Sequence, residues 1–211
     1  MKINKKITKV NYNKGKNRSI KYIVIHYVGA TGTAENNCKY FERFYRGASA
    51  HYFVGHSGDV WQCVEDKDIA WHCGAITYKH KTCRNANSIG IELCCRKGDK
   101  WYFEQETIDA ATELVKELMK KYNIPASNVL RHYDITGKKC PEPFVRDIKA
   151  WENFRAQLTT TTTKLKTVEE LAKEVIAGKW GNGTARKKAL SAAGYDYKTV
   201  QSLVNKLLPK K

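Results

Sequence analysis

Apolar and polar residues follow two patterns along most of the chain. The first pattern, short runs rich in β-branched apolar residues, predicts strands. The β-branched runs Lys21–His26, Ser88–Leu93 and Asn128–His132 indicate buried strands. Two shorter runs, Tyr52–Val54 and Val60–Cys63, flank a His-Ser-Gly-Asp turn and indicate a hairpin. These five segments are therefore expected to supply the strands of a sheet.

The second pattern is the helical spacing of apolar residues, and it recurs in three segments between and after the strands. Ala34–Arg46 carries apolar side chains at helical intervals and is followed by Gly47, a common stop signal. Glu106–Tyr122 is the clearest helix, because its apolar residues lie on one face, and Asn123 is expected to end it. A last amphipathic helix is expected over residues 144–158.

A run of five threonines, Thr159–Thr163, interrupts this pattern and indicates a linker, because it has nothing to pack. Beyond it the sequence shows three short helical patterns, which in so few residues can form only a minimal three-helix core. The predicted organisation is a first domain at residues 1–158, a Thr-rich linker at 159–166 and a small three-helix domain at 167–211.

Composition and charge narrow the function classes. The chain has 211 residues, of which 42% are hydrophobic and 28% charged, as in ordinary globular proteins. Its net charge of +17 favours polyanions such as nucleic acid, anionic lipid or a teichoic-acid-bearing wall. No predicted strand or helix concentrates Lys and Arg into a recognition face, so no specific nucleic-acid partner is expected. No stretch reaches the roughly 18 apolar residues of a membrane span, so no membrane insertion is expected.

The N-terminal segment Met1–Val10 is basic but lacks an apolar core of about 7–15 residues, so no secretory signal is expected. Synthesis in a cytoplasm follows, and a cytosolic origin favours free thiols. Apart from Cys140, the cysteines are expected to be reduced packing residues. They are Cys38, Cys63, Cys73, Cys83, Cys94 and Cys95.

Candidate metal ligands lie where two predicted strands end. His132 closes one strand, and Cys140 follows eight residues later in a Gly-containing loop, so imidazole and thiolate can share one ion. Zn²⁺ accepts both ligand types, and three protein ligands leave a fourth position open for water. His26, at the end of the first strand, is the candidate third ligand. The alternative for each histidine is a hydrogen-bonded structural residue.

Four segments between residues 20 and 145 carry a resemblance: YIVIHYVGATG, SAHYFVGHSGDVWQCVEDKDIAWHCGA, NSIGIELC and NVLRHYDITGKKCP. In this order they resemble the type 2 N-acetylmuramoyl-L-alanine amidases of the phage-lysin and peptidoglycan-recognition-protein superfamily. The resemblance implies an α/β fold, with a mixed central β-sheet flanked by helices and a zinc groove. It also implies that His26, His132 and Cys140 are the ligands of Zn²⁺.

Two catalytic roles follow from the same resemblance. Glu92, in the I-G-I-E stretch, would face the metal and transfer protons, and Lys138 would stabilise the oxyanion. The alternatives are a strand-end glutamate in solvent and an ordinary surface lysine, with Lys139 beside it. Another branch of the superfamily has a tyrosine where this chain has Ala50, so Glu92 is expected to take over that role.

Three further residues are candidates for substrate contact. Trp71 and His72 resemble a groove-wall segment of the family, with sugar or peptide contact and simple packing left as alternatives. His51 is either a buried structural residue or part of the groove. His56, in the hairpin turn, is expected to be exposed to solvent.

The C-terminal segment resembles a short cell-wall-binding repeat of phage lysins, through G-K-W-G-N-G and A-A-G-Y-D-Y. A single copy limits avidity unless the protein forms a homo-oligomer. Some of the candidate binding residues can equally belong to the core. The candidates are Trp180, Asn182, Arg186, Tyr195 and Tyr197.

Together, the resemblances imply zinc-dependent hydrolysis of the amide bond between N-acetylmuramic acid and L-alanine in peptidoglycan. The expected setting is a phage or prophage endolysin that reaches the wall of a Gram-positive host after release through a holin. The alternative is a non-catalytic peptidoglycan-recognition protein on the same fold. Members that only bind typically lack a zinc ligand, whereas this chain carries His26, His132 and Cys140.

Overall fold

The central sheet of the computed structural model is built around three parallel strands. β3 (Tyr22–Tyr27) pairs with β7 (Ser88–Leu93) on one side and with β10 (Val129–Arg131) on the other. Ile23, Val24 and Ile25 are fully buried on both faces of β3. Such continuous apolar runs are typical of parallel strands that are covered on both sides.

Three more strands extend the sheet to the order β1-β5-β4-β7-β3-β10. β4 (Tyr52–Val54) pairs in parallel with β7, and β5 (Val60–Gln62) pairs antiparallel with β4 across the predicted hairpin. β1 (Ile3–Lys5) runs parallel to β5 at the edge. Because one pair is antiparallel and the others are parallel, the sheet is mixed, which confirms the predicted fold class.

Short elements connect these strands. Two small antiparallel sheets consist of β2 (Tyr12–Asn13) with β6 (Ile69–Ala70), and β8 (Arg96–Lys97) with β9 (Trp101–Tyr102). The 3₁₀ helices are η1 (Asn85–Asn87) and η2 (Ala126–Asn128). Both 3₁₀ helices directly precede a strand of the main sheet.

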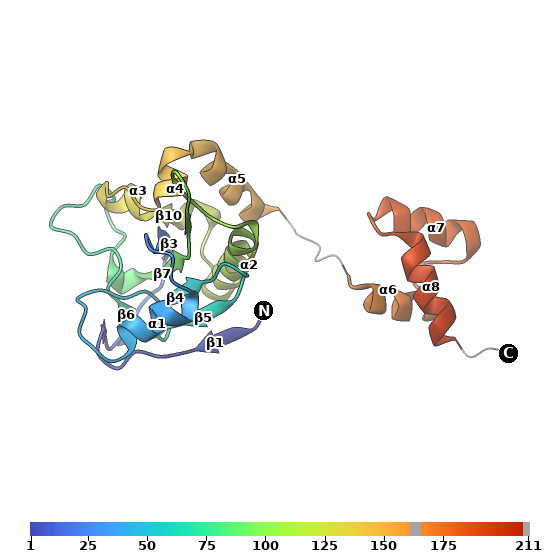
Figure 1. Cartoon of the computed structure of the whole chain (residues 1–211), viewed down its shortest axis with the longest axis horizontal. Coiled ribbons are helices and arrows are strands. Elements are labelled where there is room, and N and C mark those ends of the chain that lie inside the picture. The colour runs from blue at the N-terminus through green and yellow to red at the C-terminus, as the bar shows by residue number, and fades with distance from the viewer. Residues whose placement is uncertain (161–165, 209–211) are drawn as a thin grey trace. The chain divides into compact units, whose positions relative to one another are not determined.

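One face of the sheet is covered by α2 (Gln105–Tyr122) and α5 (Ile148–Thr159), as Figure 1 shows. Their buried side chains form the largest apolar cluster with the strands, including Leu114 and Phe154. α2 ends at Asn123, whose left-handed backbone (φ 52°) lets its N–H bond back to the carbonyl of Met119. The predicted helix end at Asn123 is confirmed.

The opposite face carries two smaller clusters. α1 (Ala34–Glu42) packs Cys38 against Phe53 of β4. α3 (His132–Thr136) buries Ile135 against Val24 and two cysteines of the loop after β6. Residues two apart on a strand share a face, so His26 lies on the same face as Val24.

Two predicted boundaries change. The predicted helix Ala34–Arg46 ends at Glu42. The predicted helix over residues 144–158 is divided into α4 (Glu142–Arg146) and α5, because Asp147 leaves the helical conformation and accepts a hydrogen bond from the N–H of Ala150. An aspartate in this position begins a new helix.

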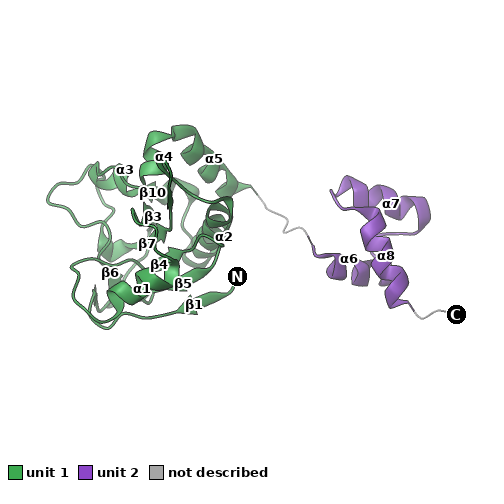
Figure 2. Cartoon of the chain, viewed as in Figure 1, with its two compact units in different colours: residues 1–160 green, residues 161–211 purple. Residues whose placement is uncertain are grey.

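The structure describes residues 1–160 and 166–208, and internal contacts divide the chain into compact units at 1–160 and 161–211 (Figure 2). Most of the predicted linker, 159–166, lies outside the described residues, although Thr159 still belongs to α5. Among the described residues, no helix combines the length and apolarity needed to cross a membrane.

The second unit contains α6 (Val168–Ile176), α7 (Gly183–Ala192) and α8 (Tyr197–Leu207), which confirms the three predicted helices. Leu171, Leu190 and other apolar side chains of these helices form its separate core. Thr167 and Glu170 form a reciprocal capping box at the start of α6, and Asp196 accepts two backbone hydrogen bonds at the start of α8. Such caps stabilise short helices that have little core.

Candidate metal centre and groove

β3 and β7 place the first metal-ligand candidate beside the candidate base. In the parallel pairing, His26 lies directly opposite Glu92, so their side chains leave the same face of the sheet. His26 is 1% exposed, and Glu92 is partly buried. The strand register thus brings together two residues that are far apart in the sequence.

The other two candidates come from the segment that follows β10. His132 is the first residue of α3, and Cys140 lies in the loop between α3 and α4. The carbonyl of Cys140 accepts a hydrogen bond of 2.8 Å from the N–H of Tyr133, which folds the loop back onto α3. Arg131 holds the same turn through an ion pair of 2.7 Å with Asp134. The predicted strand to His132 therefore ends one residue earlier.

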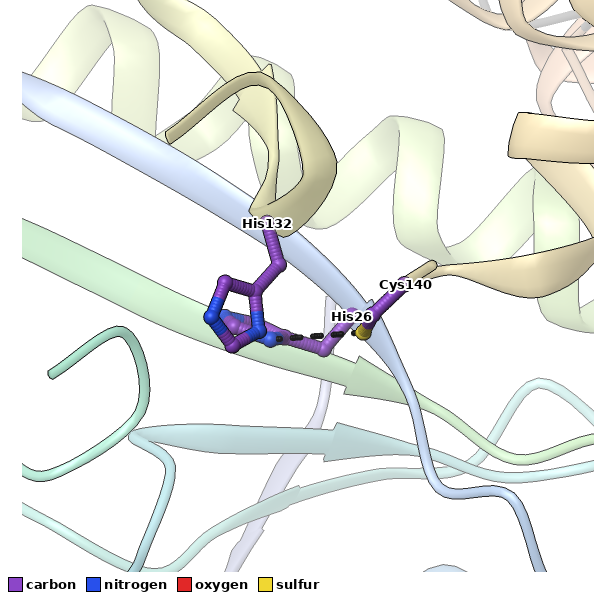
Figure 3. A group of neighbouring side chains, drawn as sticks. All are labelled: His26, His132 and Cys140. Carbon is purple, nitrogen blue, oxygen red and sulfur yellow. Dashed lines mark hydrogen bonds between the residues drawn. The ribbon is translucent and has the colours of Figure 1, made fainter. Parts of the chain in front are cut away.

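His26, His132 and Cys140 converge in the folded chain (Figure 3). Their candidate ligand atoms lie within 4.8 Å of one another, and all three residues are buried. Cys140 Sγ is 3.7 Å from His26 Nδ1. His132 Nδ1 is buried and has no hydrogen-bond partner within residues 1–160 and 166–208, as expected of an atom that binds a metal.

This donor set fits Zn²⁺, which takes imidazole nitrogen and thiolate sulfur in tetrahedral sites. Burial lowers the pKa of His26 well below its usual value, with help from neighbouring His72 and His132. Burial and the Lys138 charge lower the pKa of His132 to about 4. Both rings are therefore neutral near pH 7 and can offer a lone pair. Burial, followed by the charge of Glu92, raises the pKa of Cys140 to about 12, so this thiol must release a proton when it binds a metal.

Glu92 sits beside this cluster with one oxygen unsatisfied. Its Oε2 atom is buried, and no described residue donates a hydrogen bond to it. Burial raises the pKa of Glu92 to about 8, and the positive charge of Lys138 opposes this increase. A carboxyl group whose pKa lies near neutrality can both accept and deliver a proton.

Two adjoining cavities open around the cluster. A cavity of about 280 Å³ is lined by Glu92 together with all three ligand candidates. A second cavity, of about 650 Å³, runs along the segment from Gly74 to Thr77. Both cavities are lined by Ala48, Trp71, His72, His132 and Lys138. This shared wall makes them one groove with the candidate metal centre in its deeper part.

The lining of the groove distinguishes Lys138 from Lys139, whose roles the sequence alone does not separate. Lys138 lines both cavities, whereas Lys139 is part of neither lining. The ammonium group of Lys138 also lies close enough to influence His132 and Glu92 electrostatically. Lys138 is therefore the lysine that can reach a molecule bound in the groove.

The predicted substrate contacts divide between groove and core. Trp71 is partly exposed and lines the groove, with its indole N–H donated to Asn13. His51 is fully buried and lines neither cavity, which favours the buried structural role over the groove role. Its Nδ1 accepts a hydrogen bond of 3.0 Å from Gly90, and its Nε2 lies 3.2 Å from the carbonyl of Asp68. His51 thus takes the buried structural role, one of the two roles that the sequence left open.

The structure also refines the predictions for His72 and His56. His72 lines the groove, but both of its ring nitrogens contact protein groups, namely His26 and Ser88. The sequence analysis did not identify Ser88 as a partner of His72. A signal for this close packing was Gly90, because a glycine inside a strand often marks a place where another group approaches closely, here the ring of His72. His56, predicted to be exposed, is only partly so, and its two ring nitrogens are buried.

The cysteines other than Cys140 are all buried free thiols. Cys38, Cys63 and Cys94 belong to the cluster under α1, and Cys73 and Cys83 to the cluster under α3. Their positions agree with the predicted packing role.

The sequence of residues 16–143 matches the family described as N-acetylmuramoyl-L-alanine amidase, and this match includes every residue of the candidate metal centre. The chain belongs to the N-acetylmuramoyl-L-alanine amidase family. Residues 169–208 match a second family, the CW_7 repeat. The two matches fall in the two compact units of the fold.

Relatives of this amidase-family chain include the N-acetylmuramoyl-L-alanine amidase CwlL of Bacillus licheniformis, which is 31% identical over 95% of this chain and 58% of its own. The chain spans about half the length of the curated relatives it matches. The structure of PlyL is 25% identical with a TM-score of 0.66, over 77% of this chain and all of PlyL.

A third relative was solved with a ligand. AmiD from E. coli, in complex with the substrate anhydro-N-acetylmuramic acid-L-Ala-D-gamma-Glu-L-Lys, is 26% identical with a TM-score of 0.54. The match covers 74% of this chain and 63% of AmiD.

In the second unit, the aromatic candidates pack against each other. Trp180 and Tyr195 meet edge to face with ring centroids 5.8 Å apart, and both border the apolar core. The indole N–H of Trp180 donates to Glu174. Arg186 donates to the side chains of Asn182 and Gln201. Trp180 and Tyr195 therefore serve the packing role, and contact with a ligand stays a prediction for all five candidates.

Proposed function

We propose that this chain hydrolyses the amide bond between N-acetylmuramic acid and L-alanine in peptidoglycan, using Zn²⁺ held by His26, His132 and Cys140. The observation that carries the proposal is the convergence of these three buried ligand atoms beside Glu92, within a groove. Family membership and the peptide-sugar substrate named for AmiD support this choice of bond.

The residues around the site divide the chemistry between them. When bound, Zn²⁺ supplies a Lewis acid that polarises the carbonyl and lowers the pKa of water. Glu92 accepts a proton from the attacking water and passes it to the amine of L-alanine as that group leaves. The ammonium group of Lys138 stabilises the negative oxygen that forms on the attacked carbonyl.

The groove suits an extended ligand. Its deeper cavity contains the reacting groups, and its wider cavity leads away past the partly exposed Trp71. A tryptophan face can stack on a sugar ring or an apolar peptide side chain. We assign the deep cavity to the scissile amide, and the wider one to the flanking parts of the wall polymer.

The second unit is proposed to hold the enzyme on the wall. Its match to the CW_7 repeat and its partly exposed aromatic and arginine side chains support this role. We further propose a phage or prophage endolysin that acts on a Gram-positive wall after holin-mediated release. The net charge of +17 favours such an anionic wall. We also propose a homo-oligomer, because several copies of the repeat at residues 169–208 would increase avidity.

The competing hypothesis is a peptidoglycan-recognition protein that binds without hydrolysis. The presence of a base candidate, Glu92, beside a complete ligand set favours the enzyme. A binding protein needs no carboxyl group whose pKa lies near neutrality in its groove.

The deciding experiment digests purified Gram-positive cell walls and measures newly released L-alanine amino termini. The wild-type protein should release them, chelator-treated protein should not, and added Zn²⁺ should restore release. Glu92→Ala should bind Zn²⁺ in a one-to-one ratio but release almost none. Equal release by all these samples would contradict the proposed mechanism, whereas zinc and wall binding without release would support the recognition protein.

A further inference from the structure

A chain of three hydrogen bonds, the first two of them buried, starts at the side of His26 that faces away from Cys140. His26 Nε2 lies 3.1 Å from His72 Nδ1, and His72 Nε2 lies 3.1 Å from Ser88 Oγ. Ser88 Oγ in turn donates to the carbonyl of Arg84 at 2.7 Å. His72 is 9% exposed and Ser88 fully buried, so the two bonds of the His72 ring are largely shielded from water.

The last bond fixes the direction of the others. The carbonyl of Arg84 can only accept, so it takes the single hydroxyl proton of Ser88. Ser88 Oγ must then accept from His72, whose proton therefore sits on Nε2. A neutral imidazole carries one proton, so His72 Nδ1 is an acceptor and His26 Nε2 carries the proton that it receives.

This leaves the lone pair of His26 on Nδ1. That atom faces the cluster and lies 3.7 Å from Cys140 Sγ. A metal ligand must offer a lone pair, so the direction of the chain presents the correct nitrogen before any metal arrives. Cys73 Sγ, 4.0 Å from Ser88 Oγ, can add only a weak donor, because the hydroxyl proton is already committed.

The packing around His72 holds its ring in place. A Cβ atom at Gly90 would lie 2.4 Å from His72 Cγ, so a larger residue on β7 would displace the imidazole. The side chain of Asn85 accepts hydrogen bonds from the backbone N–H groups of both His72 and Cys73, at 3.1 and 2.8 Å. The ring therefore has one position, set from β7 on one side and from η1 on the other.

We propose that His72, oriented by Ser88, is a positioning residue that fixes the tautomer and ring orientation of His26. In this role His72 acts through the ligand and does not touch the substrate. The inference rests on the proposed zinc ligand set, but the tautomer itself is a property of the metal-free protein and can be measured there.

The test is long-range ¹H–¹⁵N NMR of the histidine rings in the full metal-free chain, with zinc affinity measured by competition with a chromophoric chelator. Wild-type His26 should show the Nε2–H tautomer. His72→Leu removes the acceptor and should give mixed tautomers and about 10–100-fold weaker zinc binding. His72→Asn retains an acceptor near the Nδ1 position and should recover part of the wild-type tautomer and part of the zinc affinity.

Ser88→Ala should shift the tautomer of His72 and weaken zinc binding less than His72→Leu does, whereas Ser88→Thr should resemble the wild type.

A matched control separates positioning from general loss of stability. Thr107 is fully buried and donates its hydroxyl proton to the carbonyl of Gly55, outside the chain of bonds. Thr107→Val removes a comparable bond and should leave zinc affinity and the His26 tautomer unchanged. If His72→Leu fails to fold, the comparison of Ser88→Ala with Thr107→Val tests the proposal, because only Ser88→Ala should change the tautomer and the zinc affinity.

The proposal is overturned if metal-free wild-type His26 carries its proton on Nδ1. It is also overturned if His72→Leu and Ser88→Ala both retain wild-type tautomers and zinc affinity. Failure of the proposed function gives a different result: His26→Ala would then bind Zn²⁺ as tightly as the wild type, while the tautomer measurement would be unaffected.

Discussion

At the scale of single residues, the active-site candidates are held in states that cost stability. Glu92 has an ordinary pKa of 4.5 that burial raises to about 8 in the fold. Between these two values the folded chain keeps a proton that the unfolded chain loses, so stability falls as the pH rises from about 4.5 to 8. A buried carboxyl without a hydrogen-bond donor is useful for proton transfer and unfavourable for folding.

Glu92→Gln should therefore stabilise the metal-free protein while it removes activity. At pH 9 we expect the variant to gain about 1–3 kcal/mol in the free energy of unfolding, and almost nothing at pH 4. Release of L-alanine amino termini should fall by about 10²–10⁴-fold. Thermal unfolding at several pH values together with the wall digestion checks both effects. A variant that is less stable at pH 9 would contradict this account of Glu92.

Cys140 provides a second prediction at this scale. Because its thiol has a pKa of about 12, Zn²⁺ must displace one proton from it near neutral pH. The apparent zinc affinity should then rise about tenfold for each unit of pH between 6.5 and 8.5. His132, with a pKa of about 4, is already neutral and adds no slope. Chelator competition across this range measures the slope. Cys140→Asp should bind more weakly and show a shallower slope, and an equal slope in both would rule out thiolate coordination.

At the scale of elements, one carboxylate ties the loop after the β4–β5 hairpin to the end of α2. Asp66 accepts hydrogen bonds from Tyr52 of β4, from Lys121 at 2.8 Å and from Tyr122 at 2.6 Å. Burial alone would raise the pKa of Asp66, but the bonds from these three residues outweigh burial and lower it below 3.8. A lowered carboxyl pKa adds stability above the unfolded value, which is lost as the pH falls through the folded value.

Asp66→Asn should thus destabilise the first unit by about 1–3 kcal/mol at pH 7. The difference from wild type should shrink below pH 4, because the unfolded chain takes up a proton there first and the folded carboxylate, with its lowered pKa, follows as the pH falls further. Zinc affinity should stay unchanged, because Asp66 lies outside the groove lining. Denaturant unfolding at pH 7 and pH 3 provides the measurement, with Tyr122→Phe as a milder control that removes one bond. If the difference in the free energy of unfolding between Asp66→Asn and wild type were the same at both pH values, the loss of stability would come from packing and not from the charge of Asp66.

At the scale of the whole molecule, two units with separate cores carry separate tasks in the proposed function. The groove and all residues of the candidate metal centre lie within residues 1–160. The repeat match lies within residues 169–208. Catalysis and attachment should therefore be separable.

A fragment of residues 1–160 should hydrolyse a small soluble muramoyl-peptide with kcat/KM within about twofold of the full chain. Its digestion of intact walls should fall more strongly, because attachment that raises the local substrate concentration is lost. Co-sedimentation with walls and parallel kinetics on both substrates provide the test. Equal wall binding by fragment and full chain would remove the attachment role from the second unit.

Many features of this fold follow from local patterns in the sequence. Strand-forming runs and amphipathic helices are local signals, and so is the placement of His26, His132 and Cys140 at or just after strand ends. Which residues come into contact depends on the folded arrangement of the strands and loops. The register of β3 against β7 sets His26 beside Glu92, and the loop geometry selects Lys138 over Lys139. Likewise, His51 is buried while His72 reaches His26, because such contacts depend on distances in space between residues remote in sequence.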